Sequence, residues 1–460
     1  MALIKSISGI RGTIGGEVGE NLTPIDLARF TASFASYISS EKKGEGPTKI
    51  VVGRDARISG AMCKSIVCGV LQGCGVDVVD IDLATTPTVE VAVTELGADG
   101  GIILTASHNP KQWNALKLLG SNGEFLNAVQ GKKVLDMASA EEFSFAEVDF
   151  LGGVEQLDFN ARHIEMVLAL PLVDVEAVKA RGFKVVVDAV NSVGGIVIPE
   201  LLRQMGCEVV ELNCVADGQF AHNPEPLKEH LTEISAKVKE CGADLGVVVD
   251  PDVDRLAFIS EDGEMFGEEY TLVAVADYIL SKLGGGATVS NLSSSRALRD
   301  LTRGYGSEYS AAAVGEVNVV AKMKEVGAVI GGEGNGGIIY PELHYGRDAL
   351  VGVALFLTYF TEKGCTMSEL RKTYPQYFMS KNKAQLTPDI DVDALLETLA
   401  DKYKEYDVTT IDGVKVDMPE GWVHLRKSNT EPIVRIYSEA HTQSEADELA
   451  QLFVNEILKK

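Results

Sequence analysis

The segment Lys49-Ile-Val-Val-Gly-Arg-Asp55 decides the fold class, because a short Val/Ile run bounded by polar residues and glycine is typical of a strand. A helical pattern over residues 62–72 follows it, and Gly75-Val-Asp-Val-Val-Asp-Ile81 then predicts a second strand. Strand, helix and strand in this order predict a parallel α/β unit.

The same order of elements recurs further along the chain. Lys184-Val-Val-Val-Asp188 predicts a strand, which is followed by a helix over residues 198–205 and a strand over residues 206–212. A weaker copy is spread over residues 287–332. The sequence therefore predicts a repeat of α/β units.

The end of the chain follows a different plan. An amphipathic helix pattern over residues 391–406 precedes three β runs. These runs cover residues 408–416, 422–426 and 433–439. A last helix is predicted from about Glu445, with Ser444 and Asp447 as its capping box. This order predicts a small α+β domain.

The length of 460 residues predicts several domains, since a domain usually holds about 100–200 residues. Shifts in the pattern of elements place the boundaries. We expect domains at residues 1–155, 156–260, 261–370 and 371–460.

Composition excludes several classes of protein. Lys plus Arg total 42 and Asp plus Glu total 67, so the net charge of −25 argues against nucleic acid and anionic membranes as partners. No apolar run is long enough for a transmembrane helix, and the N-terminus does not resemble a signal peptide. Seven scattered cysteines without a CxxC or Cys/His cluster indicate reduced thiols and a cytoplasmic protein, and argue against a zinc site.

The first candidate for chemistry is the loop Thr105-Ala-Ser-His-Asn-Pro110, which follows the apolar strand Gly101-Ile-Ile-Leu104. Open α/β sheets bind ligands at the carboxyl ends of their strands. Asn109-Pro110 predicts a turn that projects the Ser107 hydroxyl, and a serine reacts only when it is activated or already phosphorylated. The alternative is an ordinary polar turn at a strand end.

Lys117 lies inside the apolar stretch that follows this loop. It is either a surface lysine whose stem packs on apolar neighbours or a proton carrier whose pKa is lowered by its surroundings.

The second candidate is Asp250-Pro-Asp-Val-Asp-Arg255, directly after the strand Leu245-Gly-Val-Val-Val249. Three carboxylates so close together repel one another unless a cation lies among them, and all-oxygen ligands favour Mg²⁺ or Ca²⁺. An EF-hand loop has the same spacing, but Arg255 stands where that loop needs glycine. An aspartyl-phosphate phosphatase also starts with Asp-x-Asp, but it would not have Asp254 at that place.

The third candidate is the glycine-rich loop Gly331-Gly-Glu-Gly-Asn-Gly-Gly337. Its glycines permit close approach of the backbone to a ligand, and the Glu333 carboxylate and the Asn335 amide can bind sugar hydroxyls. No GxGxxG motif opens a helix after a first strand, so dinucleotide binding is not supported.

The fourth candidate is Arg426-Lys-Ser-Asn-Thr-Glu-Pro432, followed by Arg435. Hydroxyls, an amide, backbone N–H groups and arginines together predict a phosphate cradle. The alternative is a hairpin turn with surface ion pairs.

Together, these four loops resemble those of the α-D-phosphohexomutase family over essentially the whole chain and in the family's order. They are similar to its phosphoserine, metal, sugar and phosphate loops, respectively. Ser8-Gly-Ile-Arg-Gly12 and Gly53-Arg-Asp-Ala-Arg-Ile-Ser59 resemble two further family motifs. The resemblance implies three similar α/β domains plus a smaller C-terminal domain around a central cleft.

The resemblance also implies a mechanism and a set of site residues. Ser107 would carry a phosphoryl group and, with Asp250, Asp252 and Asp254, hold one Mg²⁺ per chain. Hexose 6-phosphate and hexose 1-phosphate would interconvert through a sugar bisphosphate, which also primes the enzyme. The partners would be small sugar phosphates, for a monomer or a homodimer. The remaining implied site residues are Lys117, Arg11 and His108 for catalysis, and Arg255, Glu333, Asn335, Arg426, Ser428, Asn429, Thr430 and Arg435 for substrate binding.

The sugar loop differs from that of many family members, because Gly337 stands where they have histidine. Its Gly-Glu-Gly-Asn-Gly-Gly form looks most like that of a phosphoglucosamine mutase subgroup, which favours glucosamine phosphate as substrate. Phosphoglucomutase or phosphomannomutase activity is the runner-up. Two competing hypotheses are a metal-dependent sugar phosphatase and a non-catalytic sugar-phosphate binding protein.

Overall fold

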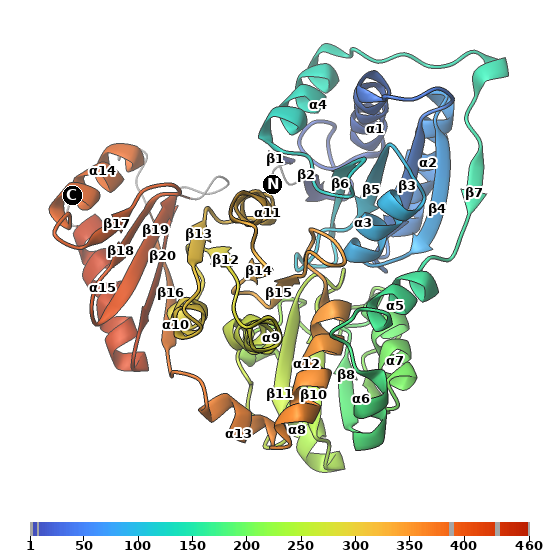
Figure 1. Cartoon of the computed structure of the whole chain (residues 1–460). Helices are drawn as coiled ribbons and strands as arrows, with labels where there is room; N and C mark the ends of the chain where they lie inside the picture. Colours follow the sequence, from blue (N-terminus) through green and yellow to red (C-terminus); the bar gives the residue numbers. More distant parts are fainter. Residues whose placement is uncertain (1–2, 7–8, 386–390, 428–432, 459–460) are drawn as a thin grey trace. The chain divides into compact units, whose positions relative to one another are not determined.

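The computed structural model describes residues 3–6, 9–385, 391–427 and 433–458 (Figure 1). The chain divides into two compact units. One contains Met1–Thr271 and Gly336–Ser368, and the other contains Leu272–Asn335 and Glu369–Lys460. Within the described ranges, every helix is too short or too polar to cross a bilayer.

The first domain is built on a mixed sheet with strand order β1-β2-β6-β5-β3-β4-β7. Its strands are β1 (Ile4–Ser6), β2 (Gly9–Thr13), β3 (Lys49–Arg54), β4 (Asp77–Leu83), β5 (Gly100–Leu104), β6 (Trp113–Gly120) and β7 (Val154–Gln156). Its helices are α1 (Pro24–Glu41), α2 (Gly60–Gly73), α3 (Thr86–Glu95) and α4 (Ala128–Ala140).

Both faces of this sheet are covered, as the alternation of buried side chains requires. Ile50 and Ile102 face a core shared with α1, α2 and α4, whereas their neighbours Val51 and Ile103 face a second core with α3. The carboxyl ends of β3 and β5, which are parallel, therefore lie at one edge of a sheet buried on both sides.

The second domain contains a sheet with strand order β11-β10-β8-β9. Its elements are α5 (Asn160–Leu168), α6 (Val175–Arg181), β8 (Lys184–Asp188), α7 (Gly194–Gln204), β9 (Glu208–Leu212), α8 (Thr232–Cys241), β10 (Leu245–Val249) and β11 (Leu256–Ser260). Helix α12 (Ala349–Lys363) packs on β11, and Phe356 stacks on Phe258 with ring centroids 4.1 Å apart.

In the third domain, β12 lies between β13 and β14 and is parallel to both. Its elements are α9 (Glu268–Leu283), β12 (Thr288–Asn291), α10 (Arg296–Gly304), β13 (Tyr309–Ala312), α11 (Glu316–Val326), β14 (Ile330–Glu333) and β15 (Gly337–Ile339). Helix α13 (Met367–Lys372) precedes the C-terminal domain.

The predicted repeat of α/β units is confirmed. Each copy is a strand, a helix and a neighbouring parallel strand: β3-α2-β4, β8-α7-β9 and β12-α10-β13. The predicted fold class, three α/β domains followed by a smaller α+β domain, is confirmed as well.

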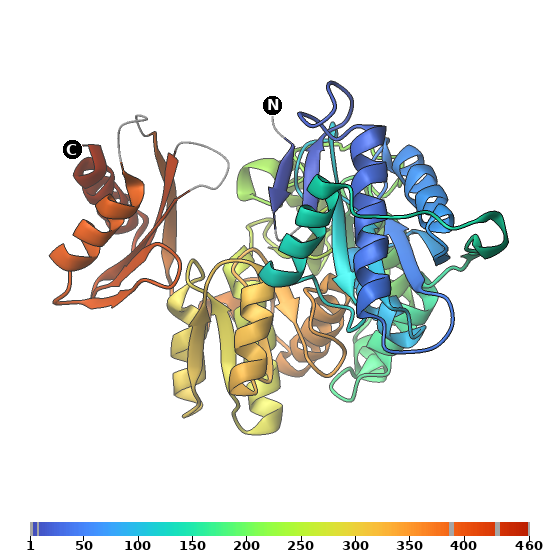
Figure 2. The same ribbon diagram turned by 90° about the horizontal axis from the view of Figure 1, so that it is seen from above.

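The C-terminal domain is an antiparallel sheet with strand order β16-β20-β19-β18-β17. Its elements are β16 (Phe378–Gln385), α14 (Val392–Lys402), β17 (Asp407–Thr409), β18 (Val414–Asp417), β19 (Gly421–Lys427), β20 (Ile433–Ala440) and α15 (Gln443–Leu458). Helices α14 and α15 share one core against this sheet (Figure 2).

Three features of this domain differ from the expectation. The β run over residues 408–416 is two strands, because the chain turns at Gly413, whose φ of +73° and close approach to the Leu425 carbonyl favour glycine. Strand β16 was not expected, since its two buried positions hold the small residues Ser380 and Ala384 instead of large apolar side chains. The cap of α15 also lies earlier than predicted: Thr442 Oγ1, not Ser444, accepts the hydrogen bond from the Glu445 N–H, at 3.2 Å.

Candidate functional site

The Ser107 loop begins where β5 ends, as the sequence predicts. Ser107 is largely buried and has a φ of +48°, a conformation that a non-glycine residue keeps only when its surroundings hold it there. Its N–H donates to Thr105 Oγ1 at 2.9 Å, and Thr105 Oγ1 donates to Asp55 Oδ2 at 2.7 Å. The side chains of Thr105 and Asp55, which directly follow β5 and β3, thus hold the backbone of Ser107 in the conformation that directs its hydroxyl.

Arg57 shapes the rest of this loop. It is 1% exposed, forms an ion pair of 3.0 Å with Asp55, and donates a short hydrogen bond to the Ser107 carbonyl. The same guanidinium donates to three further carbonyls: Asn109 at 2.6 Å, Pro110 at 2.7 Å and Trp113 at 3.0 Å. A planar guanidinium with five N–H donors suits this arrangement, since one side chain can donate hydrogen bonds to several carbonyls. Arg57 belongs to the segment Gly53–Ser59, in which the local pattern predicts no role for this arginine.

The three aspartates follow β10 and converge. Asp250, Asp252 and Asp254 are each 0% exposed, and one oxygen of each lies within 4.8 Å of the others. Val253 turns the chain between them with a φ of +64°, which is strained for a β-branched residue. Ser107 Oγ donates to Asp250 Oδ2 at 2.8 Å, so the serine of the first domain and the acidic loop of the second meet at one point.

The donor atoms of this cluster fit a hard divalent cation. Burial raises the pKa of Asp250, and the charges of Asp252 and Asp254 raise it further. Asp252 Oδ1 and Asp254 Oδ1 are buried without a hydrogen-bond partner among the described residues. Buried carboxylate oxygens left in this state favour an ion that accepts oxygen ligands.

Two cations balance the acidic cluster. Lys117 Nζ lies 2.7 Å from Asp252 Oδ2 and 3.4 Å from Asp254 Oδ2, and Arg347 donates to Asp254 Oδ2 at 2.6 Å. Burial on its own would lower the pKa of Lys117, but the two carboxylates outweigh it and raise that pKa. The interpretation of Lys117 as a lysine with a lowered pKa is therefore wrong, because its partners come from another domain.

His108 and Arg255 lie beside the serine. Arg255 donates to His108 Nδ1 at 2.8 Å, and the backbone N–H of Arg255 donates to Asp250 Oδ1 at 3.1 Å. Burial and the charge of Arg255 lower the pKa of His108 to about 2, with a smaller contribution from Arg11 on β2. His108 is therefore a neutral imidazole that is too weakly basic to take up a proton at neutral pH.

Two residues of this cluster were not predicted from the sequence. Thr86, at the start of α3, donates to Asp252 Oδ2 at 2.6 Å, and Arg347 binds Asp254. Thr86 follows β4 as a polar strand end, and Arg347 precedes an apolar helix. These positions in the sequence mark Thr86 and Arg347 as polar residues beside secondary-structure ends. Only the fold shows which carboxylates they contact.

In the other unit, Glu333 ends β14 and is buried. Its Oε1 accepts hydrogen bonds from Asn291 Nδ2 at 2.9 Å and from the Gly315 N–H at 3.1 Å. The first glycine of this loop has a packing role, because a Cβ on Gly331 would clash with the Met323 sulfur. Asn335, the other predicted sugar ligand, follows Glu333 in the turn before β15.

Part of the predicted phosphate cradle, namely Ser428, Asn429 and Thr430, lies outside the described residues. On the strands that flank it, Arg426 of β19 pairs with Asp412 at 2.7 Å, and exposed Arg435 of β20 lies opposite Lys383 of β16. Lys381, Lys383 and Arg435 line one shallow depression, so the described flank is cationic.

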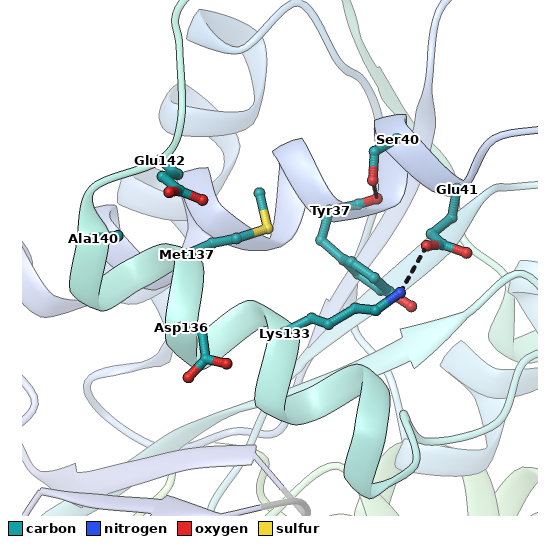
Figure 3. Close-up of a pocket in the computed structure, with 8 residues that line it drawn as sticks. All are labelled: Tyr37, Ser40, Glu41, Lys133, Asp136, Met137, Ala140 and Glu142. Carbon is teal, nitrogen blue, oxygen red and sulfur yellow. Dashed lines mark hydrogen bonds and ion pairs between the residues drawn. The ribbon is translucent and has the colours of Figure 1, made fainter.

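Another hollow lies on the first domain, between α1 and α4 (Figure 3). Its lining includes Tyr37 and the ion pair of Lys133 with Glu41, at 3.3 Å. These groups form a solvated surface pair.

We predict that Mg²⁺ stabilises the chain more at about pH 8 than at about pH 5, just above the ordinary carboxyl range. Because the folded pKa of Asp250 is raised, the stability of the metal-stripped protein falls as pH rises above the ordinary carboxyl range, and a bound cation removes this loss. The check is the melting temperature in EDTA and in Mg²⁺ at both pH values. Asp250→Asn should lose the pH dependence of the gain, and the exposed Asp262→Asn should keep it. An equal gain at both pH values would contradict the prediction.

Comparison with known families covers nearly the whole chain. It matches the models described as phosphoglucomutase/phosphomannomutase alpha/beta/alpha domain I at residues 3–145, domain II at residues 161–263, domain III at residues 267–377 and the C-terminal domain at residues 382–456.

Individual relatives agree with this match. The chain is 38% identical over 445 residues to a phosphoglucomutase/phosphomannomutase of Thermococcus kodakarensis, covering 96% of each chain. It is 34% identical over 454 residues to a probable phosphoglucosamine mutase of Methanopyrus kandleri, covering 97% of this chain and 96% of that one. The crystal structure of a phosphoglucomutase/phosphomannomutase family protein from Burkholderia thailandensis superposes with a TM-score of 0.85 at 28% identity, covering 98% and 97% of the two chains. Domain matches and relatives along the full length lead to one conclusion: the chain belongs to the phosphoglucomutase/phosphomannomutase family and is a phosphohexomutase.

Proposed function

We propose that this phosphohexomutase interconverts glucosamine 6-phosphate and glucosamine 1-phosphate through phosphorylated Ser107 and a glucosamine bisphosphate. The observation that carries the proposed chemistry is the 2.8 Å hydrogen bond from Ser107 Oγ to Asp250. It supports a nucleophile that lies directly at a cation site.

In the first half-reaction, the free hydroxyl of the sugar phosphate attacks the phosphorus of phospho-Ser107. A new sugar O–P bond forms, the Ser107 O–P bond breaks, and the sugar hydroxyl proton passes, in net terms, to Ser107 Oγ. The second half-reaction is the reverse with the other phosphate of the bisphosphate, which regenerates phospho-Ser107 and releases the isomer. Phosphoryl transfer of this kind depends mainly on positioning and on electrostatic stabilisation.

Asp250, Asp252 and Asp254 would hold one Mg²⁺, which supplies positive charge to the transferring phosphoryl group. Lys117 is proposed as an electrostatic and positioning group for the carboxylates, in keeping with its two ion pairs. Arg11 and Arg255 add positive charge beside His108 and Ser107. Neutral His108 would accept a hydrogen bond from Arg255 rather than carry a proton.

Substrate binding is assigned to the sugar loop and the phosphate loop. Glu333 and Asn335 would bind sugar hydroxyls, and Arg426, Arg435 and the segment 428–430 would bind the phosphate that does not react. A bisphosphate that returns in two orientations requires one sugar site and one distal phosphate site that accept both.

The choice of glucosamine rests on the form of the sugar loop and on the name of the Methanopyrus kandleri relative. A second candidate is phosphoglucomutase or phosphomannomutase activity, because the Thermococcus kodakarensis relative carries that name at higher identity. The substrates of the two candidate activities differ in the substituent at C2 of the sugar. One contact to this substituent is worth about 1–3 kcal/mol.

We predict that Ser107→Ala abolishes isomerisation and leaves the melting temperature nearly unchanged, because the variant cannot carry a phosphoryl group. Mass spectrometry should find phosphate on Ser107 after incubation with a sugar bisphosphate. The control is Ser65→Ala on the exposed side of α2, which should retain full activity. Normal turnover by Ser107→Ala would refute the phosphoserine mechanism, and steady release of inorganic phosphate would favour a phosphatase.

Replacement of Arg57 by lysine should lower kcat by about 100-fold, since a displacement of the reacting group by about 1 Å can have an effect of this size. Lysine cannot donate to four carbonyls in one plane. The check is kcat and KM together with the rate of Ser107 phosphorylation by bisphosphate. Arg54→Lys, on the same segment but paired with Asp82, is the matched control. An unchanged phosphorylation rate in Arg57→Lys would contradict this role.

We expect kcat/KM for glucosamine phosphate to exceed the values for glucose and mannose phosphates by about 10-fold or more. The measurement is a side-by-side assay with the three sugars, each primed with its bisphosphate. A preference for glucose or mannose would transfer the assignment to the second candidate and leave the phosphoserine mechanism intact.

A further inference from the structure

A second group of metal-ligating side chains lies outside the four loops. His163 of α5 is 0% exposed and Asp348, the N-cap of α12, is 1% exposed. His344 lies on the short loop that leads into Asp348, and Glu90 of α3 is also buried. None of these residues has a place in the proposed reaction.

Three donor atoms of this group point at one another. His163 Nε2 lies 3.0 Å and His344 Nε2 lies 3.3 Å from Asp348 Oδ2, and all three atoms lie within 4.8 Å of one another. Ligand atoms on a tetrahedral Zn²⁺, with bonds of about 2.0–2.1 Å, are separated by about 3.3 Å. The two separations from Asp348 Oδ2 are close to this value, and the two imidazole nitrogens lie within 4.8 Å of each other.

The opposite atoms of His163 and Asp348 form hydrogen bonds, and the opposite nitrogen of His344 lies at ion-pair distance from a buried carboxylate. His163 Nδ1 lies 2.9 Å from Thr88 Oγ1, and His344 Nδ1 lies 3.3 Å from Glu90 Oε2. Asp348 Oδ1 accepts from the Leu350 N–H at 2.8 Å. Zinc-binding histidines are oriented in this way, with one ring nitrogen on the metal and the other on an oxygen.

We propose that His163, His344 and Asp348 bind one Zn²⁺ ion that joins α3, α5 and the segment before α12. Two imidazoles and a carboxylate suit a borderline cation such as zinc, whereas the all-oxygen cluster of Asp250, Asp252 and Asp254 suits Mg²⁺. The ion would stabilise this part of the fold. The expected absence of a zinc site rests on cysteines and on local spacing, whereas His163 and the pair His344 and Asp348 come from distant segments.

The site also adjoins the acidic cluster. Arg347, which binds Asp254, is the residue before Asp348. On α3, Thr86 binds Asp252, and Thr88 and Glu90 contact the two histidines. A zinc ion here would therefore fix two elements that carry partners of the metal loop.

The test uses the full chain, stripped by a chelator, kept in excess Mg²⁺ and loaded with Zn²⁺ before gel filtration. Elemental analysis should find about one Zn²⁺ per chain, X-ray absorption should show two imidazole ligands, and the melting temperature should rise by at least about 3 °C. His163→Gln and His344→Gln should each weaken zinc binding by about 10-fold or more. Asp252→Asn and the exposed His441→Gln should retain it.

Two results would overturn the proposal. One is wild-type protein that retains no zinc or binds it without imidazole, which would leave a hydrogen-bonded ion network only. The other is equal zinc binding by the two histidine variants. If these variants fail to fold, the X-ray absorption spectrum of the zinc-loaded wild-type protein decides whether imidazoles bind the ion.

Discussion

Three buried carboxylates at the end of one strand are the constraint on which the rest of the site depends. Asp250, Asp252 and Asp254 repel one another, and the surrounding cations and hydrogen-bond donors offset this repulsion. Lys117 and Arg347 supply charge, and Thr86 and Ser107 supply hydroxyls, from segments that are far apart in the sequence. Two carboxylate oxygens of the assembled cluster still have no hydrogen-bond partner among the described residues, which is the electrostatic basis for a divalent ion.

The Ser107 hydroxyl is positioned by a separate hydrogen-bond network. A left-handed backbone at Ser107 is held by the Thr105 hydroxyl and by one buried guanidinium that gathers four carbonyls. This network leaves the loop little freedom, so the energetic penalty of orienting the Ser107 hydroxyl is met during folding. The acidic cluster and this network meet at the hydrogen bond between Ser107 and Asp250, where a mutase needs its phosphoryl group and its cation together.

Local patterns predicted much of this. Val/Ile strands followed by helices indicated the repeated α/β units, and polar residues at strand ends located both the Ser107 loop and the acidic loop, because parallel strands carry ligands at their carboxyl ends. Strand β16 was missed because its inward positions, Ser380 and Ala384, are small, so the apolar/polar alternation that marks a strand is weak. The pKa of Lys117 and the roles of Arg57 and His163 depend on partners from other segments. Spacing along the chain contains no information about such contacts, and they could only come from the fold.

The meeting of Ser107 with Asp250 has a consequence for synthesis on the ribosome. The first domain emerges and folds before residue 250 has been made, and its own residues already set the conformation of the serine loop. A nascent chain at that stage presents the hydroxyl without its acidic partners. The complete cluster of hydroxyl and carboxylates therefore comes into existence only after the second domain has been synthesised and has packed against the first.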